Sequence, residues 1–239
     1  RVPNEDGSEE IMPEDIIVAQ KVEKEYRRGR EIIHALRDIN ITIRSGEFLV
    51  IEGKSGCGKT TLLNVLSGLD RPTDGRIIFD QMDLTVIDER ILPKIRQEKI
   101  GFIFQLFNLI STMTVYENVA APLWPTDISR QDIEDKAMDV IRAVEMVERK
   151  DHIPRQLSGG EQQRTAIARA LVNKPKVVFA DEPTGDLDTK TGTTIMQLLR
   201  KLNQQEKITF VVVTHDQELI KYADRHFTMS DGRLSGGRG

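Results

Sequence analysis

An eight-residue segment has the composition of a phosphate-binding loop. Residues 53–60 fit the pattern G-x-x-x-x-G-K-[ST] at every fixed position. Glycines let backbone N–H groups turn toward phosphate oxygens, the lysine supplies charge to the β- and γ-phosphates, and the final hydroxyl can bind Mg²⁺. A chance glycine-rich turn is the alternative, but an apolar run precedes the segment and a helical pattern follows it. The candidate nucleotide-binding residues are Gly53, Ser55, Gly56, Cys57, Gly58, Lys59, Thr60 and Thr61.

Two adjacent carboxylates follow a second apolar run. Asp181 and Glu182 come directly after residues 177–180, which read Val-Val-Phe-Ala. Taken alone, such a pair is best interpreted as a solvated strand end. Beside a complete phosphate loop, however, two side chains that point in different directions can divide the work of metal binding and water activation.

A third segment combines a serine, two glycines and the start of a helical pattern. Residues 157–164 read Leu-Ser-Gly-Gly-Glu-Gln-Gln-Arg, and an apolar helical face follows. A hydroxyl and approachable N–H groups at a helix start form a second place for an anion. An ordinary serine cap with a glycine-rich turn is the alternative. The candidate residues are Leu157, Ser158, Gly159, Gly160 and Glu161.

Three short runs are apolar on both faces, as strands buried in a parallel sheet must be. They are residues 48–51, 177–180 and 210–213, and each is followed by polar or glycine-rich segments, the last by Thr214 and His215. Open α/β sheets bind ligands at the carboxyl ends of their strands. We therefore expect the chemistry to cluster at those ends.

The remaining sequence predicts two further regions. Alternating apolar residues at 39–43 and a turn at 72–75 favour antiparallel strands between residues 16 and 80. Residues 108–173 have helical patterns: Ser129 followed by Asp132 resembles a helix cap, and an apolar face continues from Ile133 to Val147. We expect an α/β nucleotide-binding core with a helical insertion.

The composition is that of an ordinary globular protein. The 239 residues are 38% hydrophobic and 30% charged, with a formal net charge of −4, so no nucleic-acid partner is expected. The single cysteine excludes an intrachain disulfide and suits a reducing compartment. No apolar run approaches the length of a membrane span. If the protein serves a membrane process, we expect other chains to do the spanning.

The three chemical segments, in this order, resemble those of the ATPase subunit of ATP-binding cassette (ABC) transporters, and the resemblance covers nearly the whole chain. It implies an α/β fold, a P-loop ABC ATPase cassette with a mixed core sheet, an N-terminal antiparallel β part and a helical subdomain at about 108–173. It also implies a homodimer that encloses two ATP molecules, each held by one chain's phosphate loop and the other chain's signature at 157–161. Asp181 then holds Mg²⁺ together with Thr60, and Glu182 orients or polarises the attacking water.

Smaller features fit the same family. Gln105 matches the Q-loop glutamine, which contacts Mg²⁺ or water and senses the membrane partner. His215 matches the switch histidine, which reads the γ-phosphate. Tyr26 stands where an aromatic ring stacks on adenine, although plain packing is the ordinary role of a single tyrosine near a strand. With these, the residues that we expect to serve catalysis are Glu182, His215, Gln105 and Lys59.

Residues 185–188 match the D-loop, which crosses the dimer interface through Leu187 and Asp188. Asp186 stands where many relatives have a small or amide residue, and we assign it no role. Cys57 is interpreted as a small residue tolerated in the phosphate loop, but a helix N-terminus and a nearby lysine lower a thiol pKa and favour its reactivity.

Residues 181–192 and 104–110 look like the lipoprotein-releasing and macrolide-export branch, which implies export or extraction of lipoproteins, peptides or drug-like substrates. Residues 106–124 are apolar for a segment outside the core, and they are our candidate for the surface that receives an integral membrane permease. One alternative is an ATPase that signals across the membrane through a similar permease, as in cell-division control. A soluble ABC protein acting on DNA or ribosomes fits less well, because the sequence has no long coiled-coil insertion.

The expected organisation is a flexible tail at 1–14, an ABC ATPase domain at 15–231 and a flexible, glycine-rich tail at 232–239. The expected location is cytoplasmic and peripheral, on the inner face of the cell membrane.

Overall fold

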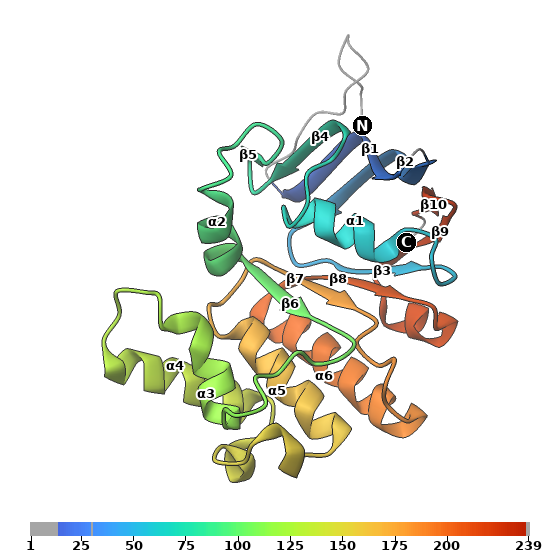
Figure 1. Cartoon of the computed structure of the whole chain (residues 1–239). Helices are drawn as coiled ribbons and strands as arrows, with labels where there is room; N and C mark the ends of the chain where they lie inside the picture. Colours follow the sequence, from blue (N-terminus) through green and yellow to red (C-terminus); the bar gives the residue numbers. More distant parts are fainter. Residues whose placement is uncertain (1–13, 30, 238–239) are drawn as a thin grey trace. The chain divides into compact units, whose positions relative to one another are not determined.

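The computed structural model describes residues 14–29 and 31–237, and its chain divides into two compact units. The first unit comprises residues 1–93 and 213–239, and the second comprises residues 94–212 (Figure 1). The N-terminal tail predicted at 1–14 lies outside the described residues except for its last position.

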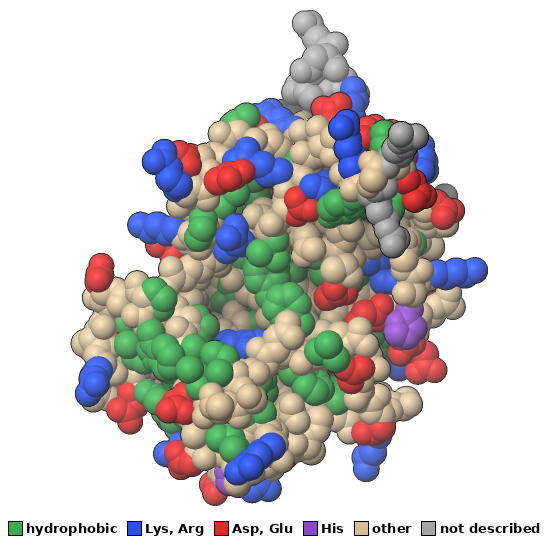
Figure 2. Space-filling model, viewed as in Figure 1, with side chains coloured by type: hydrophobic (Ala, Val, Ile, Leu, Met, Phe, Trp, Pro, Cys, Tyr) green, Lys and Arg blue, Asp and Glu red, His purple; other side chains and the backbone are tan. Residues whose placement is uncertain are grey.

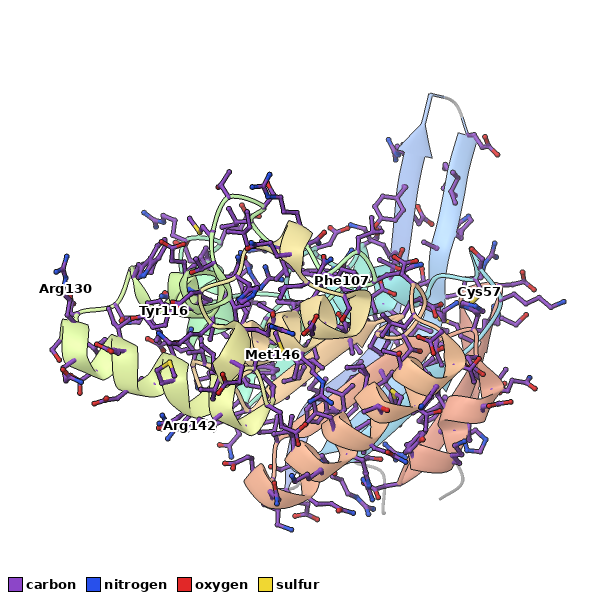
Figure 3. The ribbon with its side chains drawn as sticks, turned by 90° about the horizontal axis from the view of Figure 1, so that it is seen from below. Cys57, Phe107, Tyr116, Arg130, Arg142 and Met146 are labelled. Atoms are coloured by element: carbon purple, nitrogen blue, oxygen red, sulfur yellow. The ribbon has the colours of Figure 1, made fainter. Side chains whose placement is uncertain are left out.

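An antiparallel sheet forms much of the first unit, with the strand order β2-β1-β4-β5. These strands are β1 (Asp15–Arg28), β2 (Glu31–Arg44), β4 (Asp74–Phe79) and β5 (Met82–Asp83). Ile17 lies opposite Ile43 on one side and Phe79 on the other, and all three side chains are fully buried. The long β1–β2 pair is the projecting pair of strands in Figure 3. The antiparallel strands expected between residues 16 and 80 are therefore present.

The first unit also holds the strand that leads into the phosphate loop. This strand, β3 (Phe48–Glu52), runs parallel to β9 (Arg225–Ser230), which pairs antiparallel with β10 (Arg233–Gly236). Residues 48–51 are fully buried, as an apolar run inside a sheet requires. Helix α1 (Lys59–Leu66) follows the loop, and the short helix η4 (Gln217–Tyr222) precedes β9.

The C-terminal expectation needs correction. Glycine-rich composition predicts a frayed tail from Gly232, yet residues Arg233–Gly236 form β10. Asp231 and Gly232 both have positive φ, 48° and 77°, which suits the tight turn of a two-stranded hairpin. The Gly232 N–H also donates to the Cys57 carbonyl at 3.0 Å. An Asp-Gly pair is a sequence signal for a hairpin turn. The prediction of a frayed tail overlooked it because it relied on the glycine content alone.

The second unit contains parallel strands and most of the helices. Strand β6 (Ile100–Ile103) runs parallel to β7 (Val177–Asp181), whose other neighbour is β8 (Thr209–Thr214). The last two residues of β8 belong to the first unit. Helices α3 (Val115–Ala120), α4 (Arg130–Ala143) and α5 (Gly159–Leu171) pack on one another, and α6 (Thr189–Glu206) packs on α5. The single-turn helices are η1 (Ala121–Leu123), η2 (Val147–Arg149) and η3 (Pro154–Gln156). Helix α2 (Leu92–Lys99) crosses the boundary between the units.

The helical expectations hold in part. Ser129 caps α4 and accepts a hydrogen bond from the Asp132 N–H at 3.1 Å, as predicted. The apolar face does not continue to Val147, because α4 ends at Ala143 and Glu145 takes a left-handed φ of 61°. Val147 consequently lies in η2 and is 37% exposed.

The predicted fold class, an α/β cassette with an antiparallel N-terminal part, a mixed sheet and packed helices, is confirmed. Within the described part of the chain, no helix combines the length and the hydropathy needed to cross a membrane.

Candidate nucleotide site

The phosphate loop connects β3 to α1 and closes around its own lysine. The Lys59 ammonium donates to the Gly53 carbonyl at 2.7 Å and to the Lys54 carbonyl at 3.1 Å. The lysine is only 6% exposed. The Gly53 N–H donates to the carbonyl of Thr214, the last residue of β8, at 3.1 Å. The loop therefore holds the buried Lys59 ammonium directly after the buried strand β3.

Two glycines of the loop occupy positions that no side chain could fill. A Cβ on Gly53 would lie 2.5 Å from the Met229 carbonyl oxygen, and a Cβ on Gly58 would lie 2.5 Å from the Ala35 carbonyl oxygen. Gly58 also has a φ of 109°, in the region that L-residues rarely adopt. The two glycines are thus required where the loop packs directly against neighbouring backbone, which fixes the path of the loop.

The start of α1 lies directly after the phosphate loop. Gly58 is its N-cap residue, and no described side chain caps the helix there. The first N–H groups of a helix have no intrahelical partner, and the helix dipole makes that end positive. Thr60 is exposed in the first turn, and Thr61 is half-buried beside it. Cys57, labelled in Figure 3, is half-buried in the same loop.

Two further predicted site residues belong to the first unit. Tyr26 lies near the end of β1, is 38% exposed and donates its hydroxyl to Asp70 Oδ2 at 2.7 Å. Burial, then the neighbouring Asp70 carboxylate, raises the pKa of Tyr26. His215 is exposed and directly follows Thr214, the residue bonded to Gly53.

The two carboxylates of the second unit lie at the end of β7. Asp181 is the last residue of the strand, and both Asp181 and Glu182 are half-buried. Glu182 has a φ of 47°, which is uncommon for a residue with a side chain. The Glu182 carbonyl accepts the Gly185 N–H at 3.0 Å. This turn ends the strand directly after Asp181.

The structure brings Gln105 and the D-loop together. Gln105 Nε2 donates to Asp186 Oδ1 at 3.1 Å. A Cβ on Gly185 would lie 3.0 Å from the same Gln105 nitrogen, so the two segments approach closely. Asp188 is the N-cap of α6 and accepts the Thr191 N–H at 3.1 Å. The side-chain hydrogen bond from Thr191 lowers the pKa of Asp188.

The signature segment forms a closed cap on α5. Ser158 Oγ accepts the Glu161 N–H at 3.3 Å, and Glu161 Oε2 accepts both the N–H and the hydroxyl of Ser158 at 2.8 Å. Arg149 Nε donates to Glu161 Oε1 at 2.9 Å. The backbone N–H of Ser158, followed by Arg149, lowers the pKa of Glu161 from 4.5 to about 2. A Cβ on Gly159 would lie 3.1 Å from Leu187 Cδ2, so the signature touches the D-loop.

The segment after Gln105 is held by a half-buried arginine. Arg169 of α5 donates to the carbonyls of Phe107, at 2.7 Å, and Asn108, and burial lowers its pKa. Phe107 is labelled in Figure 3. Leu106 and Trp124 are nevertheless 73% and 50% exposed. Hydrophobic side chains also gather on the surface of Figure 2 over the region of α3 and α4.

Three partners of these residues were missed by sequence reasoning. Lys24 and Asp70 contact Tyr26, and Arg149 contacts Glu161. Lys24 precedes Tyr26 by two positions, and strand periodicity could have placed both on one face. No local pattern connects Asp70 to Tyr26, because 44 positions separate them.

A buried lysine inside a glycine cradle, between a buried strand and an uncapped helix, defines a phosphate-loop nucleotide-binding protein. The comparisons with known proteins agree with this class. The ABC transporter family model matches residues 36–185. An uncharacterised ABC transporter ATP-binding protein of Methanocaldococcus jannaschii, MJ0796, is 46% identical over 223 residues, which cover 92% of this chain and 95% of the relative.

Solved structures give the same result. The dimeric MJ0796 cassette in a post-hydrolysis state with ADP and Pi matches with a TM-score of 0.84 and 43% identity, over 93% of this chain and 99% of that one. The protein cbiO1 of Clostridium perfringens, part of the ABC transporter complex cbiONQ, matches with a TM-score of 0.84 and 31% identity, over 94% and 89% of the two chains. The chain belongs to the ABC transporter family, and it is an ATPase of the ATP-binding cassette type.

Proposed function

We propose that this ATPase dimerises around two ATP molecules and thereby drives a conformational change in an integral membrane permease, for export or extraction of lipoprotein, peptide or drug-like substrates. The observation that carries the proposal is the phosphate loop with Lys59 held inside a backbone cradle. Dimeric structures of the related MJ0796 cassette support the dimer.

In this proposal the first unit supplies the groups that hold the nucleotide. Lys59 and the N–H groups of the loop bind the β- and γ-phosphates, and the Thr60 hydroxyl meets the metal ion. Tyr26 stacks on the base, and His215 reads the γ-phosphate. The glycines at 53 and 58 keep the loop backbone in place, because a side chain at either position would collide with a neighbouring carbonyl oxygen.

The second unit supplies the hydrolytic groups. Asp181 and Gln105 hold Mg²⁺, partly through water, and Glu182 orients the attacking water. Among the described residues, no three His, Cys, Asp or Glu side chains form a group that could hold a metal. This fits Mg²⁺ that arrives with the nucleotide, because Mg²⁺ is usually bound by one or two carboxylates plus phosphate oxygens and water. When bound, Mg²⁺ neutralises charge on the phosphates.

Two other segments face partner chains. Residues 106–124 would contact the permease, and the signature at 157–161 would contact the nucleotide of the second subunit. Leu106, Ile110 and Trp124 are exposed large apolar side chains of the 106–124 segment, in which Arg169 holds the Phe107 and Asn108 carbonyls. Such a surface suits an apolar segment of a permease. We place the protein in the cytoplasm, peripheral on the inner face of the cell membrane. There it would be held at the membrane by its contact with the permease.

Affinity capture from detergent-solubilised native membranes, followed by mass spectrometry, tests the proposal. Leu106→Asp should lose the co-purifying membrane protein while ATP binding persists. Val86→Asp is the matched control, because Val86 is equally apolar and 78% exposed. Equal recovery by Leu106→Asp and wild type would overturn the docking surface. A recovered permease-like protein that controls an extracytoplasmic enzyme, rather than moving a substrate, would favour the signalling alternative.

A further inference from the structure

A compact polar cluster surrounds Tyr26 in the first unit. The Tyr26 hydroxyl donates to Asp70 Oδ2 at 2.7 Å, and the Lys24 ammonium donates to Asp70 Oδ1 at 2.6 Å. Lys24 also donates to the Arg71 carbonyl at 2.7 Å. The Asp70 carboxylate therefore accepts a hydrogen bond from Tyr26 at one oxygen and from Lys24 at the other, and both donors belong to β1.

The same carboxylate is fixed to the helix that follows the phosphate loop. The N–H groups of Leu69 and Asp70 both donate to the carbonyl of Asn64 in α1, at 2.9 and 3.0 Å. Helix α1 begins at Lys59. A short chain of hydrogen bonds thus runs from the helix of the phosphate loop, through Asn64 and Asp70, to the hydroxyl of Tyr26.

Lys24 occupies one face of the tyrosine ring. Its ammonium nitrogen lies 4.9 Å from the ring centroid, within the range of a cation–π contact. The tyrosine is still 38% exposed. A flat ligand can therefore stack on the ring only from the side that Lys24 does not cover.

The charges of the cluster agree with this arrangement. Burial raises the pKa of Asp70, but hydrogen bonds from Lys24 and Tyr26 outweigh burial and leave the pKa below its ordinary value. Asp70 is therefore ionised at neutral pH, which keeps both donors attached to it.

We propose that Asp70 and Lys24 are positioning residues for base recognition: together they hold the Tyr26 ring at a fixed place relative to the phosphate loop, with one face presented to the purine of ATP. The inference rests on the proposed stacking role of Tyr26 and assigns the specificity of that stacking to two residues outside the loop. Neither residue needs to touch the nucleotide.

The first test compares a ligand that carries a purine base with a ligand that has phosphates only. Asp70→Ala should weaken binding of a non-hydrolysable ATP analogue by about fivefold, a fraction of the usual worth of one base–aromatic stack. Binding of inorganic tripolyphosphate, which offers phosphates alone, should stay unchanged. Asp88→Ala is the matched control, because Asp88 is an exposed, ion-paired aspartate of the same unit. Equal weakening of both ligands would overturn the proposal.

The second test asks whether Asp70 acts through Tyr26. In a Tyr26→Ala background, Asp70→Ala should cause no further loss of affinity for the ATP analogue. Additive losses would mean that Asp70 only supports the fold and would overturn the positioning role. Asp70→Asn keeps an acceptor for the phenol, so it should retain most of the affinity even if Asp70→Ala folds poorly.

Titration of the phenol gives an independent readout. The alkaline absorbance change of Tyr26, isolated by subtracting the titration of Tyr26→Phe from that of the parent, should show a lower pKa in Asp70→Ala than in wild type. Burial is the larger cause of the raised pKa and remains, so the fall should be partial. An unchanged pKa would contradict the contact on which the proposal depends.

Failure of the inference is distinguishable from failure of the proposed function. If Lys59→Ala weakens binding of both ligands while Tyr26→Ala leaves ATP-analogue affinity unchanged, the nucleotide site stands and the base-positioning role is refuted. If the wild type binds neither ligand, the proposed nucleotide site itself is refuted.

Discussion

Two helices of this protein begin with glycine-rich segments, and their N-termini are built in opposite ways. Helix α1 has the left-handed Gly58 as its N-cap residue, and no described side chain caps it. Helix α5 starts at Ser158 with a complete capping box from Glu161. A buried lysine lies beside the first helix start, whereas an ionised carboxylate with a pKa of about 2 occupies the second.

The difference shows which helix start can bind phosphate without help. In the proposed function, the N–H groups of α1 and the Lys59 ammonium together bind an anion within one chain. At α5 the chain's own carboxylate already accepts the Ser158 donors, so a phosphate there must compete with it. We therefore expect the signature to engage a nucleotide only when another chain presents one.

Lys59→Ala should have the largest effect on nucleotide affinity. Loss of a charged hydrogen bond to phosphate costs about 1.5–3 kcal/mol, or roughly 10- to 100-fold in Kd. Calorimetric titration of the single chain with ATP measures it. Lys94→Ala is the control, because the Lys94 side chain is 74% exposed. If Lys59→Ala bound ATP with the wild-type affinity, the start of α1 would not be the phosphate site that distinguishes it from the start of α5.

Ser158→Arg should separate binding from hydrolysis. The phosphate loop stays intact, so the single chain should bind ATP with a Kd within about twofold of wild type, less than 0.5 kcal/mol. The bulky cation should obstruct closure of the dimer and reduce the steady-state ATPase rate. Normal turnover in this variant would show that the signature does not contact nucleotide.

Cys57 gives a chemical probe of the α1 site. A thiol alkylating agent should inactivate the nucleotide-free ATPase, because an added group would crowd the phosphate cradle. Bound ATP should slow the modification, and Cys57→Ser should keep activity and lose sensitivity. The chain has no second cysteine to confuse the result. Equal modification rates with and without saturating ATP, at full activity, would reopen the phosphate-loop assignment.

The smallest effect concerns the cap of α5. The folded-state pKa of Glu161 is lowered from 4.5 to about 2, so its stabilisation is complete above pH 4.5 and is lost as the pH falls toward 2. The loss should be at most about 1 kcal/mol, because the ion pair with Arg149 is partly exposed. Denaturant unfolding of wild type and Glu161→Gln measures it. A pH dependence that is the same in both proteins would assign this acid sensitivity to other carboxylates.

Local patterns in the sequence predict much of this structure. Residues 48–51, 177–180 and 210–213 were predictable as buried strands, because each is apolar on both faces. The phosphate loop and the signature were predictable because their residue types follow one another directly along the chain. Ser129 was predictable as a helix cap for the same reason.

Contacts between distant segments were not predictable in this way. Gln105 donates to Asp186, which lies 81 positions away, and Tyr26 donates to Asp70. Such pairs depend on how strands and helices pack, and one sequence carries no local signal of that. The hairpin at Asp231-Gly232 was different: its turn signal is local, and the glycine-rich composition around it obscured the signal.

The most direct test of the central claim, that two chains close around ATP before hydrolysis, uses Glu182→Gln. This substitution keeps the shape of the side chain and removes the carboxylate that we propose orients the attacking water. We expect ATP binding to persist, turnover to fall by about 10²- to 10⁴-fold, the usual contribution of a general base, and a dimer to accumulate with ATP and Mg²⁺ on size-exclusion chromatography. A monomer that ignores ATP and turns it over at the wild-type rate would contradict the account.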